Sequence, residues 1–488
     1  MLFNSFEFAI FFPIVTILFF LTPHKLRWLL LLLSSCVFYM YFKPVYILIL
    51  AFIIAIDYIV AIQIEKQTTQ KRKRLLLIFS LIANLGVLFI FKYFNFFATN
   101  FNSLLSAFHT GKQISIIELL LPIGLSFHTL QAMSYTIEVS RGKVKAEKHL
   151  GIYALYVMFY PQLVAGPIER PQNLIPQFHQ RQYFSYENAR RGLILIAWGL
   201  FKKMVIADRL AGFVNQVHAM PNGYYTGIPL IISAYAFIFQ IYCDFSGYSD
   251  IATGCAKFMG FTLMPNFKAP FTQKNIALLW ANYHISLTSW LRDYAYMPIR
   301  KHIFPNIGMW FSVFLVMILS GIWHGANWQF IIWGAANALV LVVYNNLKRK
   351  AFFQKLTAPL NNTISNLLTL TFFALPGIFF RSSSVTVAIT MFKNLFKDII
   401  PQIRLIAKNT HSERLNLLYL KQSSFDFFAA IFLLIGLMFI ERKFATENVD
   451  GWLIKQNKTF RWIFYYSIIT IFILIGIFKK TEFFYFQF

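Results

Sequence analysis

His324 is the residue of this chain best placed to do chemistry. It lies in the stretch 320–328, SGIWHGANW, between glycines at 321 and 325 and tryptophans at 323 and 328. An imidazole changes charge near neutral pH and is therefore a suitable general base. Glycines let backbone or substrate approach closely, and the two indoles could wall a pocket. The alternative is a structural histidine hydrogen-bonded between helices; the cost of ionisable groups inside a membrane favours a functional role.

A second histidine, His284, lies in the polar stretch 280–294, WANYHISLTSWLRDY. His284 and Thr288 stand four residues apart and are expected to share a helix face, which Arg292 continues. Asp293 could pair with Arg292 or with a neighbouring element. The alternative is an interfacial amphipathic helix anchored by aromatic residues, and both interpretations stay open.

A third polar cluster, 242–250 (YCDFSGYSD), interrupts an apolar run. Asp244 and Asp250 need partners if they are buried in a membrane. One of them could orient a catalytic histidine through its far ring nitrogen. Alternatively, both cap the start of a helix, which is the expectation for Asp250.

Other catalytic and metal-binding patterns are missing from the sequence. The chain has no GxSxG, HExxH, Walker or GxGxxG motif, so a covalent serine mechanism is not supported. Its three cysteines, Cys36, Cys243 and Cys255, form no CxxC pair, which argues against a disulfide framework or a thiolate zinc site. We expect no metal.

The composition indicates that these residues are carried by a membrane protein. The 488 residues are 58% hydrophobic and only 13% charged, whereas soluble domains carry about 25% charged residues. A net charge of +26 would suggest nucleic acid in a soluble protein, but no RNA- or DNA-binding motif is present. In a membrane protein the excess indicates cytoplasmic loops, and a basic cytoplasmic face could also receive an acidic acyl donor.

The apolar runs predict an all-α polytopic protein with about a dozen passes of ~20 residues each. Several runs are broken by Pro and Gly, at 121–124 and 164–167, which favours a packed body around a central funnel. About thirteen apolar residues before His324 rise only about 20 Å, which places it within the ~30 Å hydrocarbon layer. Basic residues at 25, 27 and 71–74 put those loops in the cytoplasm and the N-terminus outside. We predict one domain over 1–488, with N-terminal helices 1–110, a catalytic core 115–345 and C-terminal helices 346–488.

Five blocks of residues resemble the membrane-bound O-acyltransferase family, in particular its bacterial alginate O-acetylation branch. They are 121–127 (LPIGLSF), 160–168 (YPQLVAGPI), 242–252 (YCDFSGYSDIA), 284–294 (HISLTSWLRDY) and 321–328 (GIWHGANW), with a weaker match at 379–381 (FFR). The family's hallmark histidine falls on His324 and its second motif histidine on His284. The sequence departs from the pattern at 281–283 (ANY), where relatives carry a basic, Trp-containing run, at Asn337, where many carry a histidine, and at His128, where an aromatic residue is usual.

The resemblance implies transfer of an acyl group, expected to be acetyl, from a cytoplasmic thioester to a hydroxyl. His324 would accept the hydroxyl proton, and His284 or Asn327 would donate to the developing oxyanion. The predicted substrate-binding residues are Asp244, Ser246, Trp290, Arg292, Trp323 and Asn327. No cofactor is expected to be tightly bound; the donor would be acetyl-CoA or an acyl-carrier protein.

The resemblance also implies partners and a location. We expect a bacterial cytoplasmic (inner) membrane protein that works with the lipid bilayer and no nucleic acid. Its acceptor would be an extracytoplasmic polysaccharide or a periplasmic SGNH-type acetyltransferase. Two rival functions remain: a transporter or flippase without chemistry, and a non-catalytic scaffold that passes an acyl group to a periplasmic transferase.

Overall fold

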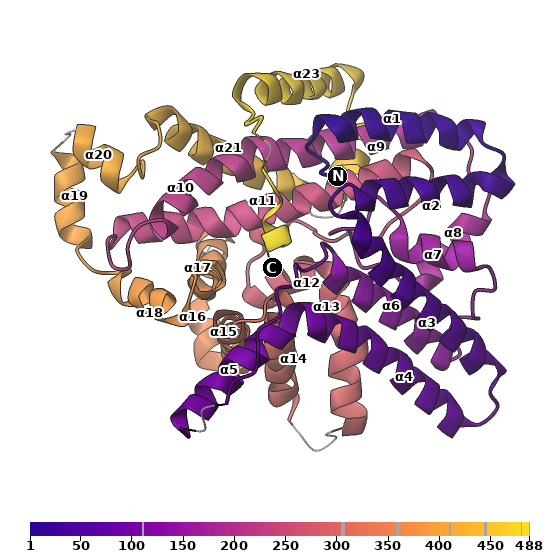
Figure 1. Ribbon diagram of the computed structural model, residues 1–488. Helices are drawn as coiled ribbons and strands as arrows, with labels where there is room; N and C mark the ends of the chain where they lie inside the picture. Colours follow the sequence, from indigo (N-terminus) through magenta and orange to yellow (C-terminus); the bar gives the residue numbers. More distant parts are fainter. Residues whose placement is uncertain are drawn as a thin grey trace. The chain divides into compact units, whose positions relative to one another are not determined.

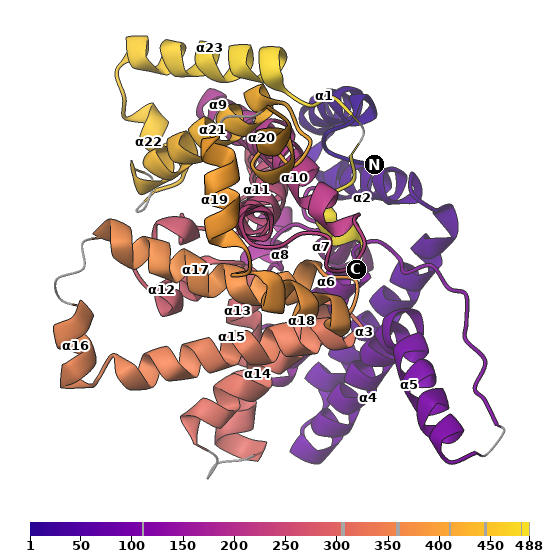
Figure 2. The ribbon, with the colours of Figure 1, turned by 90° about the vertical axis from the view of Figure 1, so that its left-hand side faces the viewer.

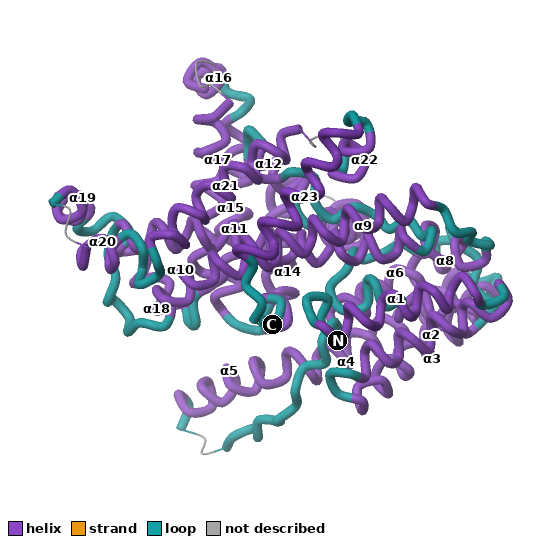
Figure 3. The backbone as a smooth tube through the Cα atoms, turned by 90° about the horizontal axis from the view of Figure 1, so that it is seen from above, coloured by secondary structure: helices purple, strands orange, loops and turns teal. Residues whose placement is uncertain are grey.

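The computed structural model describes residues 1–109, 112–303, 308–357, 362–408, 411–443, 447–479 and 481–487. Throughout these ranges the backbone forms helices and connecting loops and no strand, which confirms the all-α prediction (Figure 3). Contacts divide the chain into two compact units: residues 1–196 with 249–265, and residues 197–248 with 266–487. The predicted boundaries at 110 and 345 stay predictions.

The first unit is built from long apolar helices followed by shorter ones (Figure 1). They are α1 (Phe6–Leu21), α2 (His24–Met40), α3 (Ile47–Lys66), α4 (Gln70–Leu88), α5 (Phe94–Ala107), α6 (Leu125–Ser140), α7 (Leu150–Met158), α8 (Pro171–His179) and most of α9 (Tyr186–Leu200). A π-helical turn, Phe89–Tyr93, joins α4 to α5.

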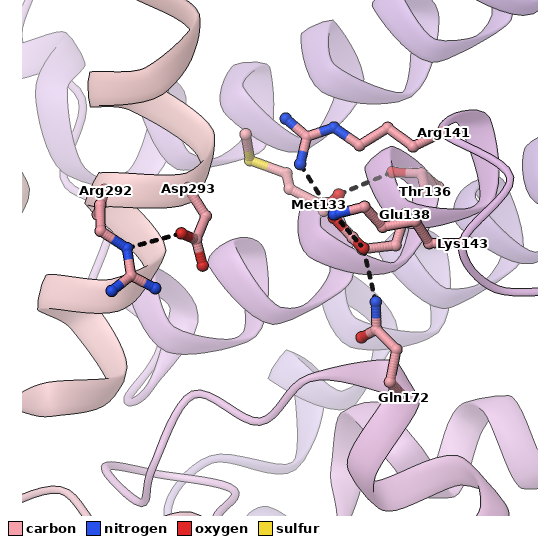
Figure 4. Close-up of polar contacts among 8 residues, drawn as sticks. All are labelled: Met133, Thr136, Glu138, Arg141, Lys143, Gln172, Arg292 and Asp293. Atoms are coloured by element: carbon pink, nitrogen blue, oxygen red, sulfur yellow. Dashed lines mark hydrogen bonds and ion pairs between the residues drawn. The ribbon is translucent and has the colours of Figure 1, made fainter.

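Two buried carboxyl groups in this unit accept hydrogen bonds from nearby polar side chains. Asp57 on α3 is fully buried and accepts hydrogen bonds from Ser80 (2.6 Å) and Asn84 (2.9 Å) on α4. At the end of α6, the buried Glu138 accepts from Arg141 (3.0 Å) and Gln172 (2.6 Å), as Figure 4 shows. These pairs make burial of the carboxylates tolerable, because each charge keeps hydrogen-bond donors.

The apolar stretch 116–135 is not one continuous span. Residues 112–124 are not helical, and α6 begins only at Leu125. Gly124 has φ 78°, and a Cβ there would lie 2.8 Å from the carbonyl oxygen of Val164. Pro122 and this left-handed glycine together end the extended segment and start the helix, as the predicted break at 121–124 requires.

The second unit contains His284, His324 and the helices around them (Figures 1 and 2). A π-helical segment, Phe201–Ala207, leads into α10 (Asp208–His218), α11 (Ile228–Phe258), α12 (Ile276–Asn282), α13 (Ile285–Leu291), α14 (Met309–His324), α15 (Trp328–Leu347), α16 (Ala351–Thr357), α17 (Asn362–Arg381), α18 (Val385–Asn394), α19 (Ile399–Ala407), α20 (His411–Leu417), α21 (Ser424–Lys443), α22 (Val449–Ile454) and α23 (Lys458–Ile475). The last part of α11, from Ser249 onward, belongs to the first unit.

The cluster 242–250 does not interrupt a helix; α11 runs through it without a break. The prediction that Asp250 caps a helix start is therefore wrong, because Asp250 is in the helix interior. The polar residues are tolerated there because lysines from the preceding π-helical segment reach them. Lys203 Nζ lies 2.6 Å from Asp244, and Lys202 Nζ donates to Ser246 at 2.8 Å.

Seven described helical segments are long and apolar enough to cross a membrane. They are Pro44–Lys66, Gln70–Ala107, Ile228–Phe258, Trp328–Leu347, Asn362–Arg381, Ser424–Lys443 and Lys458–Ile475. Two shorter apolar helices, Phe6–Leu21 and Met309–His324, accompany them. The sixteen residues of α14 rise about 24 Å, so its last residue, His324, ends a helix shorter than the ~30 Å hydrocarbon layer. The predicted dozen passes stay a prediction.

Candidate active site

His324 is the last residue of α14, at the turn that leads into α15. Glycines hold the two helices together: a Cβ at Gly321 would collide with the carbonyl oxygen of Phe330, and one at Gly334 with that of Met317. This close approach directs the imidazole toward aromatic side chains. Its ring centroid lies 5.1 Å from that of Trp333 and 5.2 Å from that of Phe380, and the residue is 6% exposed.

His284 takes a strained backbone conformation between α12 and α13. Its φ of 47° and ψ of 54° are left-handed, which costs a non-glycine residue about 1–2 kcal/mol. The predicted helix face running from His284 through Thr288 to Arg292 is therefore interrupted at its first residue. Such strain persists only where surrounding contacts enforce it, and it is typical of functional sites.

Asn266 enforces the conformation of His284. Its backbone carbonyl accepts from the N–H of Ile285 at 2.8 Å. Its side-chain Oδ1 accepts from the backbone N–H of Ser286 at 3.2 Å and from the Ser286 hydroxyl at 2.9 Å. The same oxygen lies 3.0 Å from Nδ1 of His284.

These contacts fix the tautomer of His284. The backbone N–H of Ser286 can only donate, so the atom that it meets must be the amide oxygen of Asn266. Nδ1 of His284 must then be the donor to that oxygen, and Nε2 of the neutral ring carries the lone pair. His284 therefore presents a hydrogen-bond acceptor at Nε2.

Both histidines line one cavity of about 160 Å³ within the second unit. Its remaining wall is mainly apolar and aromatic, with Phe237, Tyr283, Trp333, Phe373 and Phe380 among the lining residues. Thr288 and Ser320 are the lining hydroxyls of α13 and α14; the Thr288 hydroxyl donates to the carbonyl of Tyr283 at 3.1 Å. A mainly apolar chamber with two imidazoles suits proton transfer, because charges that develop in apolar surroundings are weakly screened.

Trp280 adds a hydrogen-bond donor to the wall of this cavity. Its ring centroid is 5.9 Å from that of Trp333 and 5.5 Å from that of Phe373. Its indole Nε1 is buried and has no hydrogen-bond partner among the described residues. An indole nitrogen can only donate, so a ligand oxygen in the cavity would satisfy it.

Trp323 is a predicted substrate-binding residue whose ring contacts both histidines. Its ring centroid lies 4.9 Å from that of His324 and 5.9 Å from that of His284. It does not line the cavity but packs behind both imidazoles. This contact favours a role in positioning the two rings.

The other predicted binding residues lie outside the cavity lining. Asp244 pairs with Lys203, and Ser246 accepts a hydrogen bond from Lys202. Asp244 therefore does not orient a catalytic histidine; the side chain of Asn266 orients His284 instead. Trp290 packs against Tyr294, and Asn327 is an exposed residue that precedes α15. Arg292 is largely exposed and pairs with Asp293 at 2.8 Å, one of the two partners expected for that carboxylate (Figure 4). Substrate binding by these residues stays a prediction.

Asn266 and Trp280 are the site residues that sequence reasoning missed. Asn266 lies 18 residues before His284 in a loop, and no spacing rule connects the two. Trp280 is in the same polar stretch as His284, so an indole at membrane depth was a visible signal. The missing hydrogen-bond partner of its Nε1, within the described part of the chain, is evident only after folding.

The chain belongs to the membrane-bound O-acyltransferase family, whose sequence profile matches residues 31–385. It is therefore a multi-pass membrane acyltransferase. Among its relatives is the probable alginate O-acetylase AlgI of Pseudomonas aeruginosa, 35% identical over 399 residues, which cover 81% of this chain and 75% of that protein. The peptidoglycan O-acetyltransferase of Helicobacter pylori is 33% identical over 394 residues (75% and 73%). The teichoic acid D-alanyltransferase of Bacillus subtilis is 28% identical over 248 residues (48% and 60%).

Proposed function

We propose that this chain transfers an acetyl group from a cytoplasmic thioester to a hydroxyl of an extracytoplasmic polysaccharide or of a periplasmic partner. The observation that carries the proposal is the cavity lined by both His324 and His284. The O-acetylase names of two relatives support acetyl as the group and a cell-surface glycan as the acceptor. The bacterial cytoplasmic membrane, with the N-terminus outside, is the location that the basic loops favour.

In the proposed reaction His324 is the general base. It takes the proton of the acceptor hydroxyl while that oxygen attacks the thioester carbonyl. The tetrahedral intermediate then collapses, the C–S bond breaks, and the leaving thiolate takes the proton from the imidazolium. The proton taken from the hydroxyl thus ends on the leaving thiol, one C–O bond replaces one C–S bond, and no atom changes its oxidation state.

The fixed tautomer of His284 assigns it a role that differs from the one expected. A neutral ring with its lone pair on Nε2 cannot donate to an oxyanion at that atom. Because the one proton of the attacking hydroxyl goes to His324, we assign His284 to accept a hydrogen bond from a neighbouring O–H or N–H group of the substrate and so to orient the attacking hydroxyl. Asn327 is exposed and lines no part of the cavity, so the oxyanion donor that we propose is the indole N–H of Trp280.

The test uses purified protein in proteoliposomes with an acetyl thioester and a soluble acceptor. His324→Gln should retain the fold and lower the rate of acetyl transfer by about 10²–10⁴-fold, because general base catalysis supplies that range. His24→Gln, a histidine outside the cavity, is the matched control and should keep the wild-type rate. Acetyl transfer at the wild-type rate by a folded His324→Gln variant would remove His324 from the mechanism.

The same preparation separates the rival functions. A transporter or flippase would move substrate without thioester consumption and would not need an imidazole at residue 324. A non-catalytic scaffold would not consume the thioester on its own. Consumption by this protein alone, sensitive to His324→Gln, is expected only of the enzyme.

A further inference from the structure

A second cavity, of about 240 Å³, lies beside the first in the same unit. It is lined by residues of the end of α10, the loop 219–227, the start of α11, the end of α17 and the helix α18. A hydrogen bond from the backbone N–H of Gly227 to the carbonyl of Asn394 (2.9 Å) ties the loop to α18. Exposed lining residues at 221–223 and 383 form its mouth. We call this cavity the vestibule.

Arg381 is the charged residue of the vestibule. It is the last residue of α17, and its Nη2 donates to the side-chain oxygen of Asn215 at 2.9 Å. Its guanidinium carbon lies 5.7 Å from the ring centroid of Phe484, whose backbone N–H is held by Asp244 at 2.7 Å. One face and one edge of the guanidinium are thus fixed.

The rest of the guanidinium has no anionic partner in the lining of the vestibule, where none of the described residues is acidic. Its Nε is buried without a hydrogen-bond partner among the residues that the structure describes. A guanidinium has five donors in a rigid fork that matches carboxylate or phosphate oxygens. A half-buried cation with an open donor is therefore prepared for an anionic ligand.

Two further features favour negative charge in the vestibule. The first turn of α18, a ten-residue helix, contributes Val387 to the lining, and Ser383 lies just before the N-cap, so the positive dipole end of the helix lies at the wall. His218 also lines the cavity, and burial, followed by the charge of Arg381, lowers the pKa of its imidazole to about 3. The neutral ring can donate to an anion without adding a second charge.

A third, very small pocket shares lining residues with both the vestibule and the histidine cavity. This pocket, of about 10 Å³, shares His218, Leu230 and Arg381 with the vestibule. It shares Phe237 and Gly377 with the cavity that holds His284 and His324. Phe380 lines the histidine cavity while its neighbour Arg381 lines the vestibule, so the two chambers meet at the end of α17.

We propose that the vestibule is an anion subsite in which Arg381 and His218 bind the phosphate or carboxylate oxygens of a substrate whose reacting group lies at the histidines. The inference rests on the proposed acyl transfer and adds to it the chemical class of the substrate. A phosphate would come from the acyl donor; a carboxylate would come from an acidic sugar of the acceptor. The subsite holds the charged part of the substrate at a fixed distance from the reacting atoms.

Binding, measured without turnover, tests the subsite. Dissociation constants are determined in nanodiscs for coenzyme A against pantetheine, and for a uronic acid oligosaccharide against its methyl ester. Wild-type protein should prefer one charged probe over its neutral counterpart. Arg381→Gln should weaken that probe about tenfold or more and leave the neutral one unchanged, whereas Arg381→Lys should retain part of the preference.

Two further variants complete the experiment. Arg404→Gln, an exposed arginine of α19 outside the vestibule, is the charge-matched control and should bind like wild type. Ser383→Trp narrows the mouth while keeping Arg381, and should weaken the charged probe even if Arg381→Gln does not fold. The proposal is overturned if wild type shows no preference for either charged probe, if a folded Arg381→Gln variant binds the charged probe as wild type does, or, where Arg381→Gln does not fold, if Ser383→Trp binds it as wild type does. Because no step requires catalysis, absence of acyl transfer would count against the proposed function and not against the subsite.

Discussion

The role of Asn266 can be tested by removing its side chain. The Oδ1 atom of Asn266 receives three donors, from Nδ1 of His284 and from the N–H and hydroxyl of Ser286. Each such hydrogen bond stabilises by ~0.5–1.5 kcal/mol, so the three together contribute about 1.5–4.5 kcal/mol. The left-handed backbone of His284 opposes them with about 1–2 kcal/mol.

Asn266→Ala should reverse this balance. With the three bonds lost, the strain at His284 is no longer offset, and the ring is expected to leave its pose and lose its fixed tautomer. A displacement of about 1 Å can lower a rate by ~10²-fold, which is the loss of kcat/KM that we expect. The assay is acetyl-thioester consumption in proteoliposomes, with thermal unfolding to confirm that the variant is folded.

Two variants make this experiment decisive. Asn266→Asp keeps an acceptor oxygen for the same donors and should restore part of the activity. Asn275→Ala removes another asparagine that accepts one backbone hydrogen bond, from Leu278 at 2.9 Å, and should change stability but not rate. A folded Asn266→Ala protein with wild-type kcat and KM would refute the positioning of His284 by Asn266.

Three further outcomes are expected. Trp280→Phe keeps the ring and removes the N–H, so kcat should fall by up to ~10²-fold with little change in the KM of the donor; an unchanged kcat would eliminate the indole as the oxyanion donor. His284→Gly should be more stable than His284→Ala by up to about 1 kcal/mol in the free energy of unfolding, because glycine tolerates the left-handed backbone at this position. Its thermal unfolding midpoint should therefore be higher. Equal midpoints for the two variants would mean that the backbone is unstrained. Since the pKa of His218 is lowered to about 3, the unfolded chain binds more protons between that pH and about 6.5, and the free energy of unfolding falls on acidification. The unfolding midpoint should therefore drop less between pH 7.5 and pH 5 in His218→Gln than in wild type; identical drops would contradict a buried neutral ring.

The sequence predicted the helical class and the two histidines of the site because these depend on local patterns. A polar residue that follows an apolar run is visible without a structure, as His324 is, and His284 lies in a stretch that is unusually polar for an apolar chain. The break at 121–124 was likewise evident from Pro122 and Gly124, whose backbone preferences are intrinsic.

The partners of these residues could not be predicted, since the fold decides them. Asp244 was expected at the substrate, yet Lys203 lies 2.6 Å from it and allows α11 to continue through a polar stretch. Neither the pairing of Asp244 nor the contact of Asn266 with His284 follows a sequence spacing. Arg381 was visible only as part of a weak family likeness, because its vestibule is assembled from α10, α17 and α18.

The glycine contacts between α14 and α15 have a consequence for the range of acyl groups that this fold can accept. Gly321 and Gly334 bring the two backbones into contact, so the chamber cannot extend between α14 and α15. Phe237 on α11 and Phe373 on α17 form other parts of the wall and can be exchanged for smaller residues. Longer acyl chains would be admitted by smaller side chains on those two helices, while the backbone contact between α14 and α15 stays as it is.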